Sequence, residues 1–176
     1  MASPHESTLV ILVPSAQATV GKLRRKLDSA AAWSVPLHIS IMYPFAAPDS
    51  ISDDDAARLT KLLGGVDSFD FVLSEVGWFD QRVMYLAPTP KAPFVELTNR
   101  IVAEFPQYQP YGGAYREIVP HLTVGEGIRL ARMRRTARRL ERHLPLRASA
   151  TEVSLMAPDA AGRWSVLKRF PLGPTP

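Results

Sequence analysis

Short apolar runs and amphipathic segments alternate along the whole chain. The first apolar run, residues 8–13, predicts a β-strand that ends at Pro14. In residues 16–30, apolar positions recur at helical spacing and basic side chains fill most of the other face, which predicts a helix. A second apolar run at about 36–43 predicts the next strand. The chain therefore begins as strand, helix, strand.

The second helix carries clear end signals. Ser52 is a suitable N-cap, because the three aspartates that follow it fill the first turn, where the helix dipole favours acids. Gly64-Gly65 is a typical C-terminal stop, so we expect a helix over 53–64. Strands then follow at 69–74, either ending there or continuing to 79, and at 83–87.

The same order of elements then begins again. The remaining segments predict a helix, a Tyr/Gly/Pro-rich loop, a strand, an arginine-rich helix and two closing strands, at 91–105, 107–115, 118–125, 128–142, 147–156 and 163–170. The order strand, helix, strand, helix, strand thus appears twice, although the two halves share almost no sequence identity. We interpret this as two α+β lobes.

A histidine and a hydroxyl interrupt the third element of each half in the same way. Side chains at i and i+2 of a strand point to the same face. His38 therefore shares a face with Ser40, and His121 shares a face with Thr123, while the apolar neighbours of each pair take the other face. Two imidazoles and two hydroxyls displayed from two strands indicate a phosphate-handling site.

The bare His-x-Ser/Thr pattern has low specificity. His5 also fits it, but lies in a polar N-terminal stretch, and His143 does not fit it. A single histidine on a half-buried strand is more often a core residue with a satisfied hydrogen bond than a catalytic group. The apolar strands and nearby prolines around His38 and His121 distinguish this pair from the other two.

Length and composition limit the class of protein. The chain has 176 residues, enough for one domain, and no cysteine, which excludes disulfides and a thiol nucleophile. We find no export signal or membrane span, and expect a cytoplasmic protein with no obligate protein partner. Two strand histidines without cysteine do not make a usual zinc set, so we expect neither a metal nor another cofactor.

The charge is mildly basic and uneven. A net charge of +4 suits a phosphate-bearing partner. Seven arginines lie in the helix predicted at 128–142. They could contact an RNA backbone or form a solvated face, with Leu130, Met133, Ala137 and Leu140 as the inward stripe.

The flanks Pro36-Leu37-His38-Ile39-Ser40-Ile41 and Pro120-His121-Leu122-Thr123-Val124 resemble the motifs of the 2H phosphoesterase superfamily. They are most similar to its bacterial branch, the 2′-5′ RNA ligase or cyclic phosphodiesterase family. The resemblance covers essentially the whole chain. It implies a single bilobal α+β domain over 1–176, with two pseudo-symmetric lobes of antiparallel sheet plus helices and a metal-independent site between them.

This resemblance implies a phosphodiesterase that opens the 2′,3′-cyclic phosphates of RNA ends or nucleotides. One histidine deprotonates water while the other protonates the leaving oxygen, and Ser40 and Thr123 stabilise the charged phosphorane. We assign His121 as base and His38 as acid, although the sequence does not decide between the two. Alternatives are hydrolysis of ADP-ribose 1″,2″-cyclic phosphate or another small cyclic phosphate, RNA 2′-5′ ligation, a non-catalytic RNA- or nucleotide-binding module, and coincidental motifs.

Substrate contacts are expected beside the two motifs. Phe45 follows the first motif, and Tyr115 and Arg116 precede the second, so they could stack on a base or hold a phosphate. Core packing for Phe45 and solvation for the other two are equally compatible with the sequence. Trp164 and Lys168 are weaker candidates.

Overall fold

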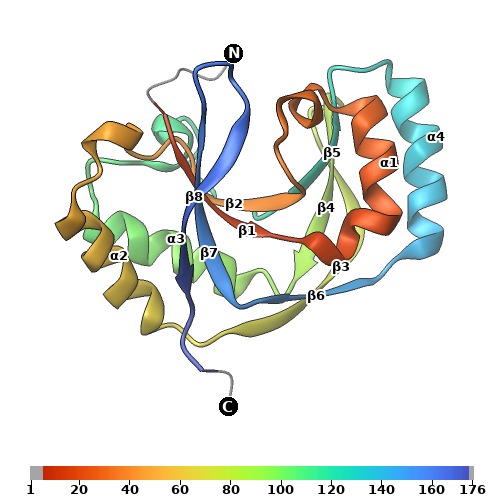
Figure 1. Cartoon of the computed structure of the whole chain (residues 1–176). Coiled ribbons are helices and arrows are strands. Elements are labelled where there is room, and N and C mark those ends of the chain that lie inside the picture. The colour runs from red at the N-terminus through yellow and green to blue at the C-terminus, as the bar shows by residue number, and fades with distance from the viewer. Residues whose placement is uncertain (1–5, 175–176) are drawn as a thin grey trace.

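Residues 6–174, which a computed structural model describes, form two four-stranded antiparallel sheets and four α-helices (Figure 1). The strands are β1 Thr8–Leu12, β2 His38–Met42, β3 Phe69–Phe79, β4 Val83–Thr89, β5 Leu122–Glu126, β6 Leu146–Ala150, β7 Glu152–Pro158 and β8 Trp164–Pro171. The helices are α1 Gln17–Leu27, α2 Asp53–Gly64, α3 Ala92–Glu104 and α4 Leu130–Leu140. The α+β class is confirmed.

The two sheets have matching strand orders, β2-β1-β7-β8 and β5-β4-β3-β6. They do not follow the two halves of the sequence. β3 belongs to the first half but pairs with β4 and β6, whereas β7 and β8 come last and complete the sheet of β1. The two lobes are therefore intertwined.

Each sheet is covered by two helices. α1 and α4 pack together, and α1 lies on β5; α2 and α3 pack together and contact β8 and β2 (Figure 1). α1 follows β1 in the sequence but covers the sheet to which β1 does not belong. Helices as well as strands are therefore exchanged between the two lobes. Gly125 in β5 permits this approach, because a Cβ atom there would lie 2.9 Å from the Cβ of Leu27.

Local end signals place the helices well. The Ser52 hydroxyl accepts a hydrogen bond from the backbone N–H of Asp55 at 3.0 Å, and the Asp55 carboxylate accepts one from the Ser52 N–H at 3.1 Å. This reciprocal capping box satisfies donors that the first turn leaves unpaired, and the helix ends at Gly64 as predicted.

The strand predicted over 147–156 is wrong, because this stretch is two strands in different sheets. β6 is an edge strand with alternating exposure, while β7 lies between β1 and β8 and is almost wholly buried. The chain changes sheets at Thr151, where neither proline nor glycine gives a break signal. The strand from Phe69 is the longer of the two alternatives and reaches Phe79.

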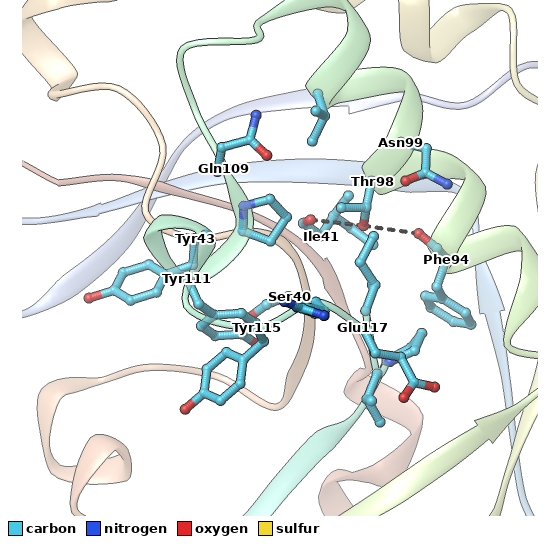
Figure 2. Close-up of a pocket in the computed structure, with 17 residues that line it drawn as sticks. Ser40, Ile41, Tyr43, Phe94, Thr98, Asn99, Gln109, Tyr111, Tyr115 and Glu117 are labelled. Atoms are coloured by element: carbon cyan, nitrogen blue, oxygen red, sulfur yellow. Dashed lines mark hydrogen bonds between the residues drawn. The ribbon is translucent and has the colours of Figure 1, made fainter.

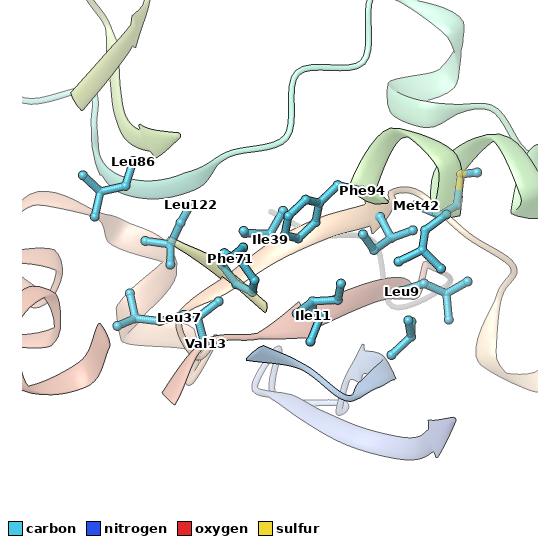
Figure 3. Packing of buried hydrophobic residues seen from close by; sticks show 14 of the residues in the cluster. Leu9, Ile11, Val13, Leu37, Ile39, Met42, Phe71, Leu86, Phe94 and Leu122 are labelled. Carbon is cyan, nitrogen blue, oxygen red and sulfur yellow. The ribbon is translucent and has the colours of Figure 1, made fainter. Parts of the chain in front are cut away.

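A single core joins the two sheets (Figure 3). Ile11 and Ile39 from the first sheet lie in the same cluster as Leu86 and Leu122 from the second. Phe94 of α3 packs edge-on against Phe71, with ring centroids 5.0 Å apart. Ile39 and Leu122 are fully buried, so their neighbours on the opposite strand faces point away from this core. No helix within residues 6–174 has the length and apolar character to cross a membrane.

Candidate active site

A cleft of about 1220 Å³ lies where the strands β2 and β5 of the two sheets approach each other. Its lining includes both predicted pairs, His38 with Ser40 and His121 with Thr123. In β2 the side chains alternate between half-buried and buried, and β5 begins with the same alternation. The period-two argument placed each histidine on one face with its hydroxyl, and the structure brings the two pairs to one cleft, although His121 lies just before β5 rather than within it.

The two histidine rings are held in the same way. Nδ1 of His38 lies 2.8 Å from the carbonyl oxygen of Pro36, and Nδ1 of His121 lies 2.7 Å from that of Val119. A carbonyl oxygen can only accept, so each Nδ1 must carry the proton. Nε2 of each neutral ring is then free to accept a proton, which is the state that a general base requires; a general acid requires the same nitrogen protonated.

Burial makes both imidazoles harder to protonate. Loss of solvation lowers the pKa of His38 to about 4; the Pro36 carbonyl and Asp28 oppose this shift, while Arg24 and His121 add to it. Loss of solvation also lowers the pKa of His121, and the Val119 carbonyl opposes the shift. Both rings are therefore neutral at pH 7 in the free protein.

Two aromatic side chains from the β3–β4 hairpin surround His121. Phe79 meets the imidazole edge-on at 4.9 Å between centroids, and Tyr85 lies at 5.4 Å. Phe79 and Tyr85 stack on each other at 4.4 Å. Gly77 makes room for this arrangement, because a Cβ atom there would overlap the Tyr85 ring. Sequence reasoning missed these residues, since only the pairing of β4 with β5 brings Tyr85 opposite Thr123.

A buried ion pair lies beside His38. Arg24 donates from Nε to Asp28 at 2.8 Å and from its guanidinium to the carbonyl oxygen of Val35 at 2.6 Å. The sequence predicts the basic side chains of residues 16–30, Arg24 among them, on the outer face of that helix; for Arg24 this is wrong, because it is 4% exposed. An Arg and an Asp four residues apart on a helix are the sequence signal that could have revealed the pair.

The loop after α3 forms one wall of the cleft. Its 3₁₀ turn, η4 (Pro110–Gly113), is tied to the end of β2 by a hydrogen bond from the Tyr111 N–H to the Tyr43 carbonyl oxygen at 2.5 Å. Figure 2 shows Tyr111 and Tyr115 beside Tyr43 and Ser40. Burial raises the pKa of Tyr111, whereas its hydrogen-bonding interaction with Ser40 lowers it.

Of the three side chains expected to contact the substrate, only one lines the cleft. Tyr115 is 70% exposed and lines both the cleft and a neighbouring pocket of about 160 Å³ between the loop and α3 (Figure 2), whereas Arg116 lines that smaller pocket but not the cleft. Phe45 is wrong as a cleft residue. It is 4% exposed and packs against Phe105 and Tyr108, because the chain turns inward after β2.

The remaining candidates are placed as follows. Trp164 lines the cleft, whereas Lys168 lies over the Phe170 ring and is not part of the lining. His5 falls outside the described residues, and His143 is exposed after α4. Within residues 6–174, no group of three or more His, Asp or Glu side chains is placed to hold a metal ion.

Comparison with known proteins agrees with this architecture. The profile of a family described as the 2′-5′ RNA ligase superfamily matches residues 12–162. Escherichia coli LigT, in a crystal structure with 3′-AMP, superposes with a TM-score of 0.59 at 20% identity, covering 97% of this chain and 99% of that one. TT0787 of Thermus thermophilus gives 0.60 at 17% identity, covering 95% and 97%. A search of curated proteins found no significant match.

The protein therefore belongs to the 2′-5′ RNA ligase superfamily, the 2H phosphoesterases, as the two motifs predicted. Usb1 of Kluyveromyces marxianus shares the fold more distantly, with a TM-score of 0.52 at 15% identity over 96% of this chain and 98% of that one. Membership of this superfamily supports a phosphoesterase or RNA-ligase-like activity.

Proposed function

We propose that this protein is a phosphodiesterase that opens 2′,3′-cyclic phosphates of RNA ends or nucleotides and leaves a 2′-phosphate. The observation that carries the proposal is the matched pair of histidines in one cleft. Each has its Nδ1 proton committed to a backbone carbonyl and a hydroxyl two residues further along the chain. Such a pair supplies both proton transfers without a metal.

The reaction needs one proton removed and one delivered. Water attacks phosphorus, and its proton passes to the neutral Nε2 of the base as the new P–O bond forms. The bond from phosphorus to the leaving sugar oxygen breaks, and the acid transfers its proton to that oxygen. Ser40 and Thr123 are suited to donate hydrogen bonds to the phosphoryl oxygens, where negative charge grows in the transition state.

The electrostatics favour His38 as base and His121 as acid, the reverse of the assignment made from the sequence alone. Both rings lose solvation, and at His38 the neighbouring cation Arg24 lowers the pKa further, an effect that Asp28 partly offsets. His38 is therefore the less easily protonated ring in the free protein. A base must be neutral and an acid protonated before attack, so the lower pKa suits the base.

The dimensions of the cleft fit a nucleotide. Its volume of about 1220 Å³ exceeds the roughly 300–1,000 Å³ usual for small-ligand pockets. Trp33, which is 46% exposed, and Trp164 line it and are suited to stack on a base. Escherichia coli LigT has been crystallised with 3′-AMP, ATP and NADP+, ligands of this chemical class.

Replacing both histidines tests whether the protein is an enzyme or a binding module. With adenosine 2′,3′-cyclic phosphate as substrate, the wild type should release a ring-opened phosphate and the His38→Ala/His121→Ala variant should release none. Binding of the product by the variant should be retained, because the cleft walls are intact. No turnover of any nucleoside 2′,3′-cyclic phosphate by the wild type, with nucleotide binding retained, would overturn the proposal. ADP-ribose 1″,2″-cyclic phosphate would then be the next substrate to test.

A further inference from the structure

Ten exposed basic side chains lie on α1, on α4 and just beyond the two ends of α4, and the two helices stand side by side along one edge of the molecule (Figure 1). We call this set the α1/α4 basic surface; it consists of Lys22, Arg25, Lys26, Arg129, Arg132, Arg134, Arg135, Arg138, Arg139 and Arg142. The rest of the chain holds more acidic than basic residues. The net positive charge is therefore concentrated at this edge.

Acidic side chains do not neutralise this surface. Within residues 6–174, none of its ten members forms an ion pair, whereas Arg58, Arg100, Arg163 and Arg169 elsewhere all do. Glu141 is the single acid in the sequence of α4 and the 3₁₀ turn that follows it. Like charges this close repel one another, so the surface costs stability unless an anion covers it.

The surface begins at the rim of the cleft. Gly127 lines the cleft, and the chain enters α4 only a few residues later. Arg134 donates a hydrogen bond at 2.9 Å to Gln81, which lies between the cleft residues Asp80 and Arg82. On α1, Arg24 lies in the cleft lining while its neighbours Arg25 and Lys26 are exposed. A chain that enters the cleft can thus continue onto this surface.

We infer that the α1/α4 basic surface binds the phosphate backbone of single-stranded RNA, so that the protein binds an RNA end more tightly than a mononucleotide. The inference rests on the proposed function for the site, but it concerns a separate surface. α4 has 11 residues and is about 16 Å long at a rise of about 1.5 Å each, enough for several consecutive phosphates. Arginine suits this role, because its planar guanidinium binds phosphate in a bidentate manner.

A membrane surface is a poorer partner for these helices. A helix that lies in a lipid interface buries an exposed apolar face in it. Met133, Ala137 and Leu140 of α4 are instead buried against the protein. The exposed face of α4 therefore carries positive charge but no apolar side chains to insert into lipid. Positive charge is what binding to a nucleic-acid backbone requires.

The test compares two triple variants that remove the same charge. Arg132→Gln/Arg135→Gln/Arg139→Gln changes one stripe of α4, since these positions are three and four residues apart. Lys61→Gln/Lys91→Gln/Arg100→Gln removes three exposed charges from α2, the N-cap of α3 and α3 itself, on the opposite side (Figure 1). The probe is a fluorescent single-stranded RNA of about a dozen nucleotides with a plain 3′-hydroxyl, so binding does not depend on the proposed reaction.

We expect the α4 variant to bind this RNA at least tenfold more weakly, and the control variant to bind it like the wild type. The slope of log K against log salt should fall by about 2 for three lost phosphate contacts. Turnover of adenosine 2′,3′-cyclic phosphate should be unchanged in both variants. If the wild type itself does not turn over this substrate, the proposed function fails, but the RNA-binding measurement still tests the basic surface.

Three results would overturn the inference. The α4 variant could bind RNA as tightly as the wild type. Both triple variants could lose affinity equally, which would mean that overall charge, not this surface, attracts RNA. The wild type could bind vesicles containing anionic lipid through α4 but not the RNA, which would assign the surface to membranes.

Discussion

His38 and His121 make matching hydrogen bonds: each Nδ1 donates to the carbonyl oxygen of the residue two positions earlier, at 2.8 and 2.7 Å. His38 begins β2 of one sheet and His121 immediately precedes β5 of the other, 83 positions later in the sequence, yet the two rings share one tautomer and line one cleft. Their surroundings differ, however, since Arg24 acts on His38 and two aromatic rings enclose His121. The two histidines are therefore held in the same way but differ in their surroundings, so we expect them to differ in how readily they gain a proton.

The pH dependence of kcat/KM should be bell-shaped, with its maximum below pH 6.5. This parameter reports the free enzyme, in which the pKa of His38 is about 4 and that of His121 is also lowered. Activity falls at high pH as His121 loses its proton and at low pH as His38 gains one. Steady-state rates at constant ionic strength measure the profile, and a maximum above pH 7.5 would contradict it.

Stability should decrease as the pH falls from about 6.5 towards 4. In this range the unfolded chain binds a proton at His38 and the folded chain does not, so acid favours unfolding. The loss from this residue is about 2 kcal/mol at pH 5. Urea unfolding of wild type and His38→Gln at pH 7 and pH 5 measures it. If the free energy of unfolding falls by the same amount between pH 7 and pH 5 in both proteins, the fold does not hold His38 neutral.

Replacing Phe79 by alanine should raise the pKa of His121. The Phe79 ring lies against the imidazole at 4.9 Å, and its removal admits water that solvates the charged form. NMR titration of the histidine ring protons measures the shift, and the His38 resonance in the same spectra is the control. If both histidines shift equally, the cleft has rearranged and the local explanation fails.

A substrate with a better leaving group should distinguish the acid from the base. Such a group departs without a proton, so a variant that lacks the acid recovers activity on it. We expect His121→Ala to lose at least tenfold less activity on a 4-nitrophenyl phosphodiester than on a cyclic phosphate. His38→Ala should be equally impaired on both substrates. Recovery in His38→Ala instead would restore the assignment made from the sequence.

The sequence predicted the elements of this fold better than their pairing. Helix ends such as Ser52 and Gly64 depend on hydrogen bonds within a few residues, which local patterns report. Sheet membership depends on contacts far apart in the chain. Nothing near Thr151 indicates that β6 and β7 belong to different sheets, and nothing in β3 indicates that it pairs with β6.

In the candidate site, too, local sequence patterns predicted some residues, whereas contacts between distant parts of the chain were not predicted. The four motif side chains were predicted because strand periodicity fixes the face of each. Phe45 was judged by its distance along the sequence from His38, but the chain turns after Met42 and packs the ring into the core. Tyr85 was missed because it reaches His121 from the neighbouring strand β4.

The most direct test of the two-histidine site is turnover of adenosine 2′,3′-cyclic phosphate in the presence of EDTA by wild type, His38→Ala and His121→Ala. We expect the wild type to be resistant to EDTA, and each single variant to lose about 10²- to 10⁴-fold in kcat, the usual contribution of one proton-transfer group. Wild-type turnover that EDTA abolishes, or full activity in either variant, would contradict the proposed mechanism.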